Sequence, residues 1–215
     1  EAEITSFVPV NDNVEIMHVV LRNIGETAQK VVPVAAVPIY GRSADNIRDH
    51  RNVTSMLHRI HTQQSSIMVK PTMSFDEKGH RRNEQIYFAA GAQGDGKAPH
   101  SFYPTVDSFI GEGGTFTHPE AVYRNKAGLP AGMEIAGREA VGGIRFEQVT
   151  LKKDETAEYV IIMGIAKREE AVEELISDYD SSVKVTQALE RVKAHWQNKV
   201  NVRYHTGDER FDLFL

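Results

Sequence analysis

The sequence predicts a mainly β protein, a sandwich of antiparallel sheets whose strands are followed by two α-helices. Three observations carry this prediction. Residues 4–24 alternate apolar and polar side chains, which is typical of strands with one buried face. Short strand candidates separated by turn residues continue as far as residue 165. Beyond that point, two stretches repeat apolar residues every three or four positions, as amphipathic helices do. Many strands followed by helices indicate a sandwich with a helical appendage.

The strand candidates follow one another with recognisable turns between them. Asparagine and aspartate at residues 11–13 divide the first run into two strands. Residues 29–40 form the next candidate, which we expect at a sheet edge because Pro33 and Pro38 cannot donate to a ladder. The polar residues 152–155 join the last two candidates in the manner of a hairpin. The remaining candidates are residues 65–75, 84–90, 143–151 and 157–165.

Residues 91–143 are rich in turn-forming residues and hold eleven of the sixteen glycines. Four prolines, at positions 99, 104, 119 and 130, fall in the same region. Long ordered loops on a sheet scaffold are often functional. They can also be plain connections between two sheets, and the sequence leaves both interpretations open.

Two amphipathic helices are expected after the strands. The first, residues 169–179, has one apolar stripe, formed by Val172, Leu175, Ile176 and Tyr179. The second, residues 183–200, repeats apolar residues at spacings of three and four: Val185, Leu189, Val192, Trp196 and Val200. We expect Trp196 to anchor a core or an interface in preference to serving as a platform for a sugar.

Composition and charge exclude several classes of protein. The chain has 215 residues, enough for one large domain with an appendage, and its net charge of -5 disfavours general nucleic-acid binding. It has no cysteine, which excludes disulfides, thiolate metal sites and cysteine nucleophiles and fits a cytoplasmic protein. No apolar run approaches the roughly 18 residues of a membrane-spanning helix. The start at Glu1 and the apolar residues 211–215 indicate a piece of a longer protein.

Two motifs that could carry chemistry are set aside. Residues 91–98 nearly match a phosphate-binding P-loop, but Ala98 stands where a magnesium-binding hydroxyl is needed, and Pro99 follows at once. A hairpin loop is the better interpretation. His58 and His61 could bind zinc from one face of a helix, yet no third ligand completes the pattern, so we expect hydrogen-bonding histidines and no metal site.

The most polar stretch is residues 40–51, which contain three arginines, two aspartates and a histidine. Residues 40–82 hold eight basic and four acidic side chains, whereas residues 152–180 hold four basic and nine acidic ones. Arginine forks suit phosphate, carboxylate or the vicinal hydroxyls of a sugar. The alternative is a loop fixed by its own ion pairs, such as Arg48 with Asp45 or Asp49.

Several short motifs in order resemble the amino-terminal sandwich of glycoside hydrolase family 94. They are Arg51-Asn52, residues 67–75, residues 81–88 (Arg-Arg-Asn-Glu-Gln-Ile-Tyr-Phe), Phe109-Ile110-Gly111, Pro119-Glu120-Ala121-Val122, Gly142-Gly143-Ile144 and the strands of residues 149–165. Residues 37–45 and Asp49-His50-Arg51 look most like the β-1,2-oligoglucan phosphorylase branch. The similarity covers residues 4–196, and recognition rests on the order of the motifs.

The resemblance implies a fold and a division of the chain. It implies a galactose-mutarotase-like supersandwich of antiparallel sheets in residues 1–166. A helical linker in residues 167–215 would lead to an (α/α)6 barrel, which is absent from this sequence. In that family the barrel carries the general acid and most phosphate ligands, so no catalytic residue, cofactor or metal is expected in this chain.

The resemblance also implies a reaction. Family members are glycosyltransferase-type phosphorylases that cleave a β-glucosidic bond with inorganic phosphate and inversion, giving a sugar 1-phosphate. The partners expected for the intact enzyme are an oligosaccharide, inorganic phosphate and a second subunit in a homodimer. We expect Arg42, Asp49, Arg51 and Glu112 to border its substrate cleft. The alternative is a stand-alone carbohydrate-binding or assembly domain, for which the aromatic platform candidates are Tyr40, Tyr87, Phe102, Tyr103 and Tyr123.

Overall fold

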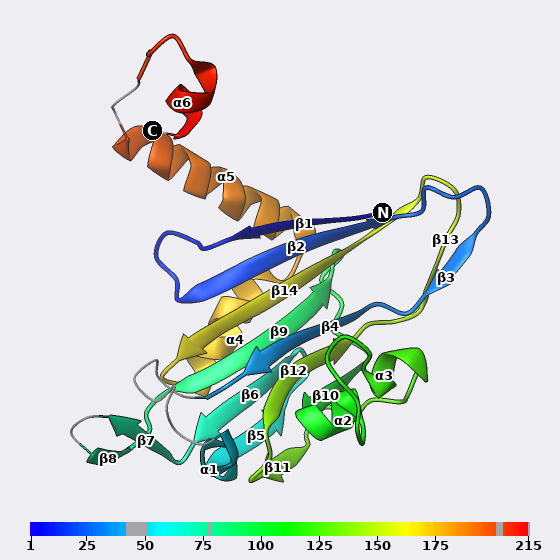
Figure 1. Cartoon of the computed structure of the whole chain (residues 1–215), viewed down its shortest axis with the longest axis vertical. Helices are drawn as coiled ribbons and strands as arrows, with labels where there is room; N and C mark the ends of the chain where they lie inside the picture. Colours follow the sequence, from blue (N-terminus) through cyan, green and yellow to red (C-terminus); the bar gives the residue numbers. More distant parts are fainter. Residues whose placement is uncertain (42–50, 77–78, 201–203, 215) are drawn as a thin grey trace.

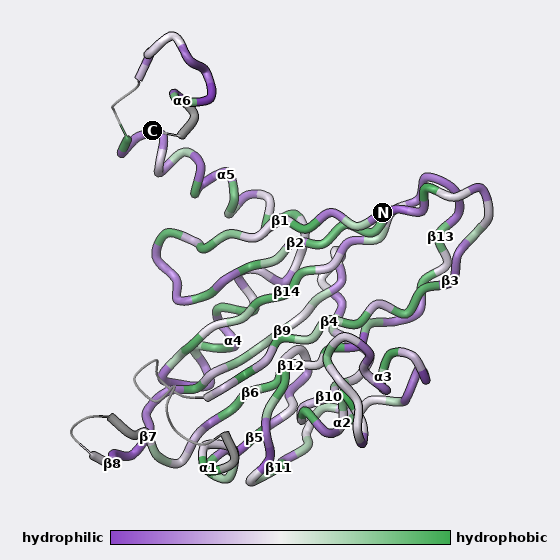
Figure 2. Tube along the Cα trace, viewed as in Figure 1, coloured by the Kyte–Doolittle hydropathy of each residue, from purple (hydrophilic) through white to green (hydrophobic). Residues whose placement is uncertain are grey.

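The computed structural model describes residues 1–41, 51–76, 79–200 and 204–214. They form three layers: a small sheet, a large sheet and a pair of helices (Figure 1). The prediction of a mainly β sandwich followed by helices is confirmed. Hydrophobic residues run along the strands of both sheets, as Figure 2 shows, because most of these strands have at least one buried face.

The large sheet is antiparallel and has the strand order β1-β2-β14-β9-β6-β5-β11. Its alternating side chains point to two different layers, which is why residues 14–22 show the polar and apolar alternation of the sequence. The bounds of its strands, in chain order, are β1 Ala2–Phe7, β2 Val14–Arg22, β5 His58–Thr62, β6 Ser66–Pro71, β9 Ile86–Gln93, β11 Glu134–Ala136 and β14 Thr156–Ala166.

The small sheet has the order β10-β12-β4, with β10 at Ser101–Thr105, β12 at Ala140–Arg145 and β4 at Val34–Ile39. The expected edge position of residues 29–40 is therefore confirmed for β4. Two further pairs complete the β structure: β3 (Gln29–Val31) with β13 (Val149–Leu151), and β7 (Met73–Asp76) with β8 (Gly79–Arg82). The expected hairpin at residues 152–155 is wrong in one respect, because β13 and β14 belong to different sheets.

The two sheets approach each other closely where small residues face across the layers. The small sheet lies over one half of the large sheet: β4 contacts β9, β12 contacts β6 and β9, and β10 contacts β5. A Cβ added at Gly142 of β12 would lie 2.4 Å from that of Ala89 on β9. One added at Gly91 would lie 3.0 Å from side chains of Ile144 and Phe146. Glycine is needed at these positions for the close approach of the layers.

The helices cover both outer faces of the sandwich. On the small sheet, α2 (Val106–Ile110) and α3 (Glu120–Tyr123) bury Phe109 and Ala121. On the large sheet, α4 (Glu169–Tyr179) has the bounds that the apolar stripe predicts, and its Val172 is fully buried. The remaining helices are α1 (Arg51–Met56), α5 (Ser182–Lys199) and α6 (Glu209–Phe214).

Helix α5 is packed at its start and free along its later turns. Val185 and Ala188 are buried against the large sheet, whereas Trp196 is 57% exposed. In Figure 1 the later turns of α5 project away from the sheets. Trp196 therefore anchors no core in this structure, and its role as an interface anchor stays a prediction. Within the described residues its ring contacts His195 and Lys199 of the same helix.

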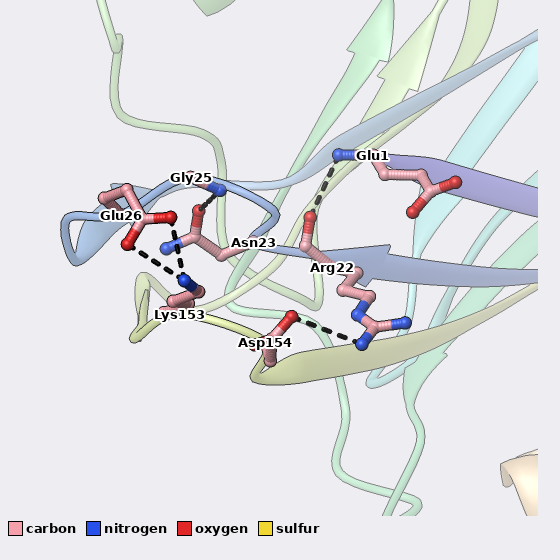
Figure 3. A network of polar contacts seen from close by, with 7 residues as sticks. All are labelled: Glu1, Arg22, Asn23, Gly25, Glu26, Lys153 and Asp154. Carbon is pink, nitrogen blue, oxygen red and sulfur yellow. Dashed lines mark hydrogen bonds and ion pairs between the residues drawn. The ribbon is translucent and has the colours of Figure 1, made fainter.

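A buried asparagine fixes the turns at one end of the large sheet (Figure 3). The Asn23 amide donates to the carbonyl oxygens of Thr27 and Leu151, both at 2.9 Å, and its Oδ1 accepts from the Gly25 amide at 3.0 Å. Ion pairs flank this centre, between Arg22 and Asp154 and between Lys153 and Glu26. The polar sequence of residues 152–155 thus serves to hold two turns together.

Candidate functional site

The end of the sandwich at which β4 finishes gathers several strand ends and two grooves. Register places Ile39 opposite Ala140, His58 opposite Pro71 and Ile86 opposite Ala166, so these strand ends share one edge of the molecule. Tyr40 and Gly41 leave β4 there, and α1 returns there immediately before β5. We name this edge the Tyr40 end; in Figure 1 it includes α1 and the β7–β8 pair.

His58 holds the backbone at this end. The side chain is buried, with Nδ1 3.2 Å from the carbonyl oxygen of Arg138 and Nε2 3.2 Å from that of Tyr40. Gly41 has φ +60° and lies so close to the ring that an added Cβ would be 2.6 Å from Nε2. Only glycine combines this conformation with this approach. The imidazole therefore fixes the point at which the arginine-rich segment begins.

The expectation of hydrogen-bonding histidines is confirmed for His58, and the structure places His61 apart from it. His58 and His61 lie on the strand β5, not on a helix, and an odd spacing sends their side chains to opposite faces. His61 instead lies 3.7 Å from Glu134 on the neighbouring strand β11. Among the described residues, no three His, Asp or Glu side chains lie close enough to hold a metal ion.

The first groove at the Tyr40 end runs between the two sheets and has a volume of about 370 Å³. We name it the Tyr40 groove; its side chains come from β2, β4, β9 and β14 and include Glu15, Tyr40, Tyr87, Met163 and Ile165. Tyr40 is 62% exposed, and burial raises the pKa of Tyr87, which keeps its hydroxyl protonated as a donor. Aromatic rings beside a carboxylate can contact the apolar face and the hydroxyls of a sugar.

The structure separates the five aromatic candidates. Phe102 and Tyr103 are both 2% exposed and belong to the core, so neither can serve as a platform. Tyr123 is exposed on α3, where its ring stacks on His118 with centroids 4.3 Å apart. Tyr40 and Tyr87 line one groove, although 46 positions separate them in the sequence. Long-range strand pairing brings them together.

The second groove is larger, about 820 Å³, and lies between the start of β9 and the start of α4. Basic, acidic and amide side chains line it, including Lys70, Arg82, Gln85, Arg168, Glu169 and Glu173. Lys70 of β6 forms an ion pair with Glu169, which lowers the pKa of that carboxyl. Donors and acceptors of both charges suit a neutral polyhydroxylated ligand better than a strongly charged one.

The structure describes only some of the four residues predicted to border the cleft. Arg42 and Asp49 lie outside the described residues. Arg51 begins α1, and its side chain is likewise outside them. Glu112 is exposed in the loop between α2 and α3, on the outer face of the small sheet. That these four residues border one cleft stays a prediction.

A serine, a histidine and a glutamate meet near the start of α5 without forming a catalytic triad. Nε2 of His18 lies 2.9 Å from Oε2 of Glu158 and 3.2 Å from Oγ of Ser182. A triad needs the serine and the carboxylate on different ring nitrogens, so that the ring can pass on a proton. Here both oxygens contact the same nitrogen, and the three residues join α5 to the large sheet.

The glycine-rich residues 91–98 have a structural role at the same place. Gly94 follows β9, its amide donates to the Glu158 carbonyl at 2.7 Å, and its carbonyl accepts from the Ser182 amide at 3.1 Å. A Cβ on Gly94 would lie 2.8 Å from Ser182 Oγ. The turn thus attaches the start of α5 to the large sheet. This agrees with the interpretation of residues 91–98 as a loop that does not bind phosphate.

The family comparison covers most of the chain. Residues 1–182 match the model of the glycosyl hydrolase 94 supersandwich domain. The chain belongs to glycosyl hydrolase family 94. No curated protein matches it. The matched part of this supersandwich domain includes the Tyr40 end, the Gly94 turn and α4, and stops at the first residue of α5. Within the described part of the domain, no helix combines the length and the apolar character needed to cross a membrane.

Proposed function

We propose that the chain is the non-catalytic β-sandwich part of an inverting glycoside phosphorylase that acts on β-linked gluco-oligosaccharides. In such a reaction inorganic phosphate attacks the anomeric carbon, the glycosidic oxygen leaves with a proton, and a sugar 1-phosphate forms. The observation that carries the proposal is the match to the supersandwich domain over residues 1–182. It supports membership of a larger phosphorylase-like enzyme, and the substrate and the phosphate chemistry are the proposed parts.

The carboxylates at the Tyr40 end favour a non-catalytic role for this chain. Hydrolysis of a glycoside uses two carboxyl groups across the scissile bond, whereas phosphorolysis needs only one acid because phosphate is the nucleophile. Glu15 is the one carboxylate among the described residues lining the Tyr40 groove. Glu169 is engaged by Lys70 and Gln63. Glu84, Glu170 and Glu173 also line the second groove, so the proposal that the general acid comes from another domain rests on the family resemblance.

We propose a corresponding division of the chain. Residues 1–166 would be the sandwich, and residues 167–215 a helical linker toward an (α/α)6 catalytic barrel. The end of β14 at Ala166 and the start of α4 at Glu169 support the boundary. The intact enzyme is proposed to be a homodimer in which the Tyr40 end borders a sugar-binding cleft. Tyr40, together with Arg42, Asp49, Arg51 and Glu112, would contribute to that border.

The test uses the intact gene product. Phosphate release is measured with a sugar 1-phosphate and a panel of β-linked gluco-oligosaccharide acceptors. For Tyr40→Ala and Arg42→Ala we expect the KM for the acceptor to rise at least about fivefold, about 1 kcal/mol, with kcat little changed. Tyr123→Ala, an exposed tyrosine on the outer face, is the matched control. Absence of phosphate release with every acceptor contradicts the proposed reaction. An unchanged KM with lower stability contradicts only the role at the cleft.

The purified chain alone is expected to have no phosphorylase or hydrolase activity. The reason is that the acid is proposed to lie in the barrel. This part of the proposal is contradicted if the isolated chain turns over a sugar 1-phosphate and a point substitution within the chain abolishes that activity.

A second candidate function is carbohydrate binding by the chain alone, and the Tyr40 groove is the observation that favours it. Two tyrosines and Glu15 line one groove of about 370 Å³. Titration calorimetry with β-linked gluco-oligosaccharides tests it. Saturable binding that is lost in Tyr40→Ala and kept in Tyr123→Ala supports this function, and no heat of binding up to about millimolar ligand contradicts it.

A further inference from the structure

One edge of β4 has its backbone groups directed away from its partner strand. The amide of Phe146 donates to the carbonyl of Pro33 at 3.0 Å, which makes Val34 and Arg145 a non-hydrogen-bonded pair of the antiparallel ladder. The N–H and C=O of Val34 therefore point away from β12. Regular pairing gives the same direction to Ala36 and Pro38. Pro38, which lacks an N–H, thus costs the ladder no bond.

This edge faces an uncovered part of the large sheet. Because β4 lies over β9, the strands β14, β2 and β1 extend beyond it. An apolar groove of about 300 Å³ lies between β4 and these strands, and we name it the β4 groove. Its side chains include Ile4, Met17, Val19 and Leu21 from the large sheet and Val37 from β4. Ile4, on the outermost strand, is 61% exposed.

The edge lacks the features that keep free edges from pairing. Proteins protect such edges with charged side chains, prolines, bulges or covering segments. Residues 34–37 read Val-Ala-Ala-Val, with no charge and no bulge in their pairing with β12. Pro38 blocks only one end. In the described part of the chain no strand pairs with this side of β4. A free apolar edge beside an apolar groove is the arrangement to which an added strand binds.

A second copy of the described chain does not fit this edge. The overhang of three strands extends roughly 14 Å beyond β4, at about 4.8 Å per strand. If β4 paired with β4 of another copy about a two-fold axis, both overhangs would lie in one layer and occupy the same space. The layer above the overhang has room for single extended strands and not for another sandwich.

We propose that the free edge of β4 and the β4 groove bind an extended polypeptide segment whose alternate side chains are apolar. Its backbone pairs with Val34 and Ala36, which offer both donors and acceptors. The side chains on one face of the segment enter the groove above Met17, Val19 and Leu21. The segment thereby continues the small sheet over the uncovered strands of the large sheet.

The probe is a labelled synthetic peptide of about ten residues in which valine alternates with threonine or lysine. A peptide of the same composition with adjacent valines is the control. We expect saturable binding of the alternating peptide by fluorescence anisotropy. Amide hydrogen exchange of Val34 and Ala36 should slow at least about tenfold when it is bound. The amides of Ala35 and Val37, which already pair with β12, should change less.

Variants locate the binding. Leu21→Glu places a charge in the groove and should weaken binding at least about tenfold, whereas Ile24→Glu, at an exposed position outside the groove, should leave it unchanged. Ala36→Pro removes an edge N–H without touching the groove floor and tests the same point if Leu21→Glu fails to fold.

Three results would overturn the proposal. The first is equal binding of both peptides or no binding of either. The second is protection at the edge of β1 or β11 in place of Val34 and Ala36. The third is a concentration-dependent dimer in sedimentation that Leu21→Glu dissociates, since a second copy would then be the occupant.

Discussion

Nε2 of His18 lies 2.9 Å from Oε2 of Glu158, and this contact joins β2 to β14 beneath the first turn of α5. Ser182, the first residue of that helix, completes the group at 3.2 Å from the same nitrogen. The three residues come from three elements and are 164 positions apart at most. Their arrangement makes the attachment of α5 depend on the charge of one carboxylate.

Glu158→Gln should remove a pH-dependent part of the free energy of unfolding. Hydrogen bonds from Ser182 and His18 lower the pKa of Glu158 in the folded state. This stabilises the fold above the unfolded pKa, about 4.3 for glutamate, and the effect is lost as the pH falls through the folded value. Because the side chain is 40% exposed, we expect a loss below about 1 kcal/mol at pH 7.

Urea denaturation at about pH 7 and about pH 3 measures this difference, which should be smaller at the lower pH. Glu147→Gln, at an exposed glutamate, is the matched control and should have no effect at either pH. A loss in Glu158→Gln of equal size at both pH values contradicts the electrostatic explanation.

Asn23→Asp should destabilise the chain by about 1–3 kcal/mol at neutral pH. The replacement keeps the shape but turns a donor into an acceptor. It would face the carbonyl oxygens of Thr27 and Leu151, and both bonds would be lost inside a site that is 8% exposed. Thermal unfolding compared with Gln148→Glu, an exposed amide-to-acid change, measures it. Equal melting temperatures of the two variants would show that Asn23 does not hold the turns.

Gly142→Ala should cost about 1–3 kcal/mol by pushing the two sheets apart. The added methyl would lie 2.4 Å from that of Ala89, so Ala89→Gly should partly rescue the variant. Ala92→Gly on the opposite face of β9 should not rescue it. Denaturation of the single and double variants gives the coupling energy, and additivity of Gly142→Ala with Ala89→Gly would contradict a direct contact.

Val185→Ala should destabilise the chain more than Trp196→Ala, although tryptophan is the larger side chain. Val185 is buried, and its truncation should cost about 1–3 kcal/mol, whereas loss of the 57% exposed Trp196 should change stability by less than about 0.5 kcal/mol. Unfolding of both variants of the isolated chain measures this. A large loss in Trp196→Ala would show that its helix turn packs on the body of the protein in solution.

The elements that the sequence predicts well are those whose pattern is local. The stripe of Val172 and Tyr179 gives the bounds of α4, and the alternation after Val14 gives β2. Strand β10 was missed because Pro104 and nearby glycines favour loops, while pairing with β12 overrides that preference. Strand β5 was missed because its alternation is short and polar, although His58, Ile60 and Thr62 are buried in turn.

The candidate site was less predictable, since strands far apart in the sequence assemble it. Tyr40 and Tyr87 were both candidates, yet nothing local indicates that they share a groove. A signal did exist for Glu15. It occupies the same face of β2 as Met17, Val19 and Leu21, so a charge interrupts an otherwise apolar row. Such an interruption indicates a place where the inner face reaches solvent.

The seating of α5 on the Gly94 turn gives the helix the mechanics of a lever arm. Its 18 residues span about 27 Å, and the bond from Ser182 to Gly94 lies at the fulcrum. A tilt of about 10° at that point would move Trp196 and Lys199 through roughly 4 Å. Loss of the contact at Gly94 would therefore displace mainly the far end of α5. Any surface that contacts Trp196 would then be separated from it by more than the diameter of a water molecule.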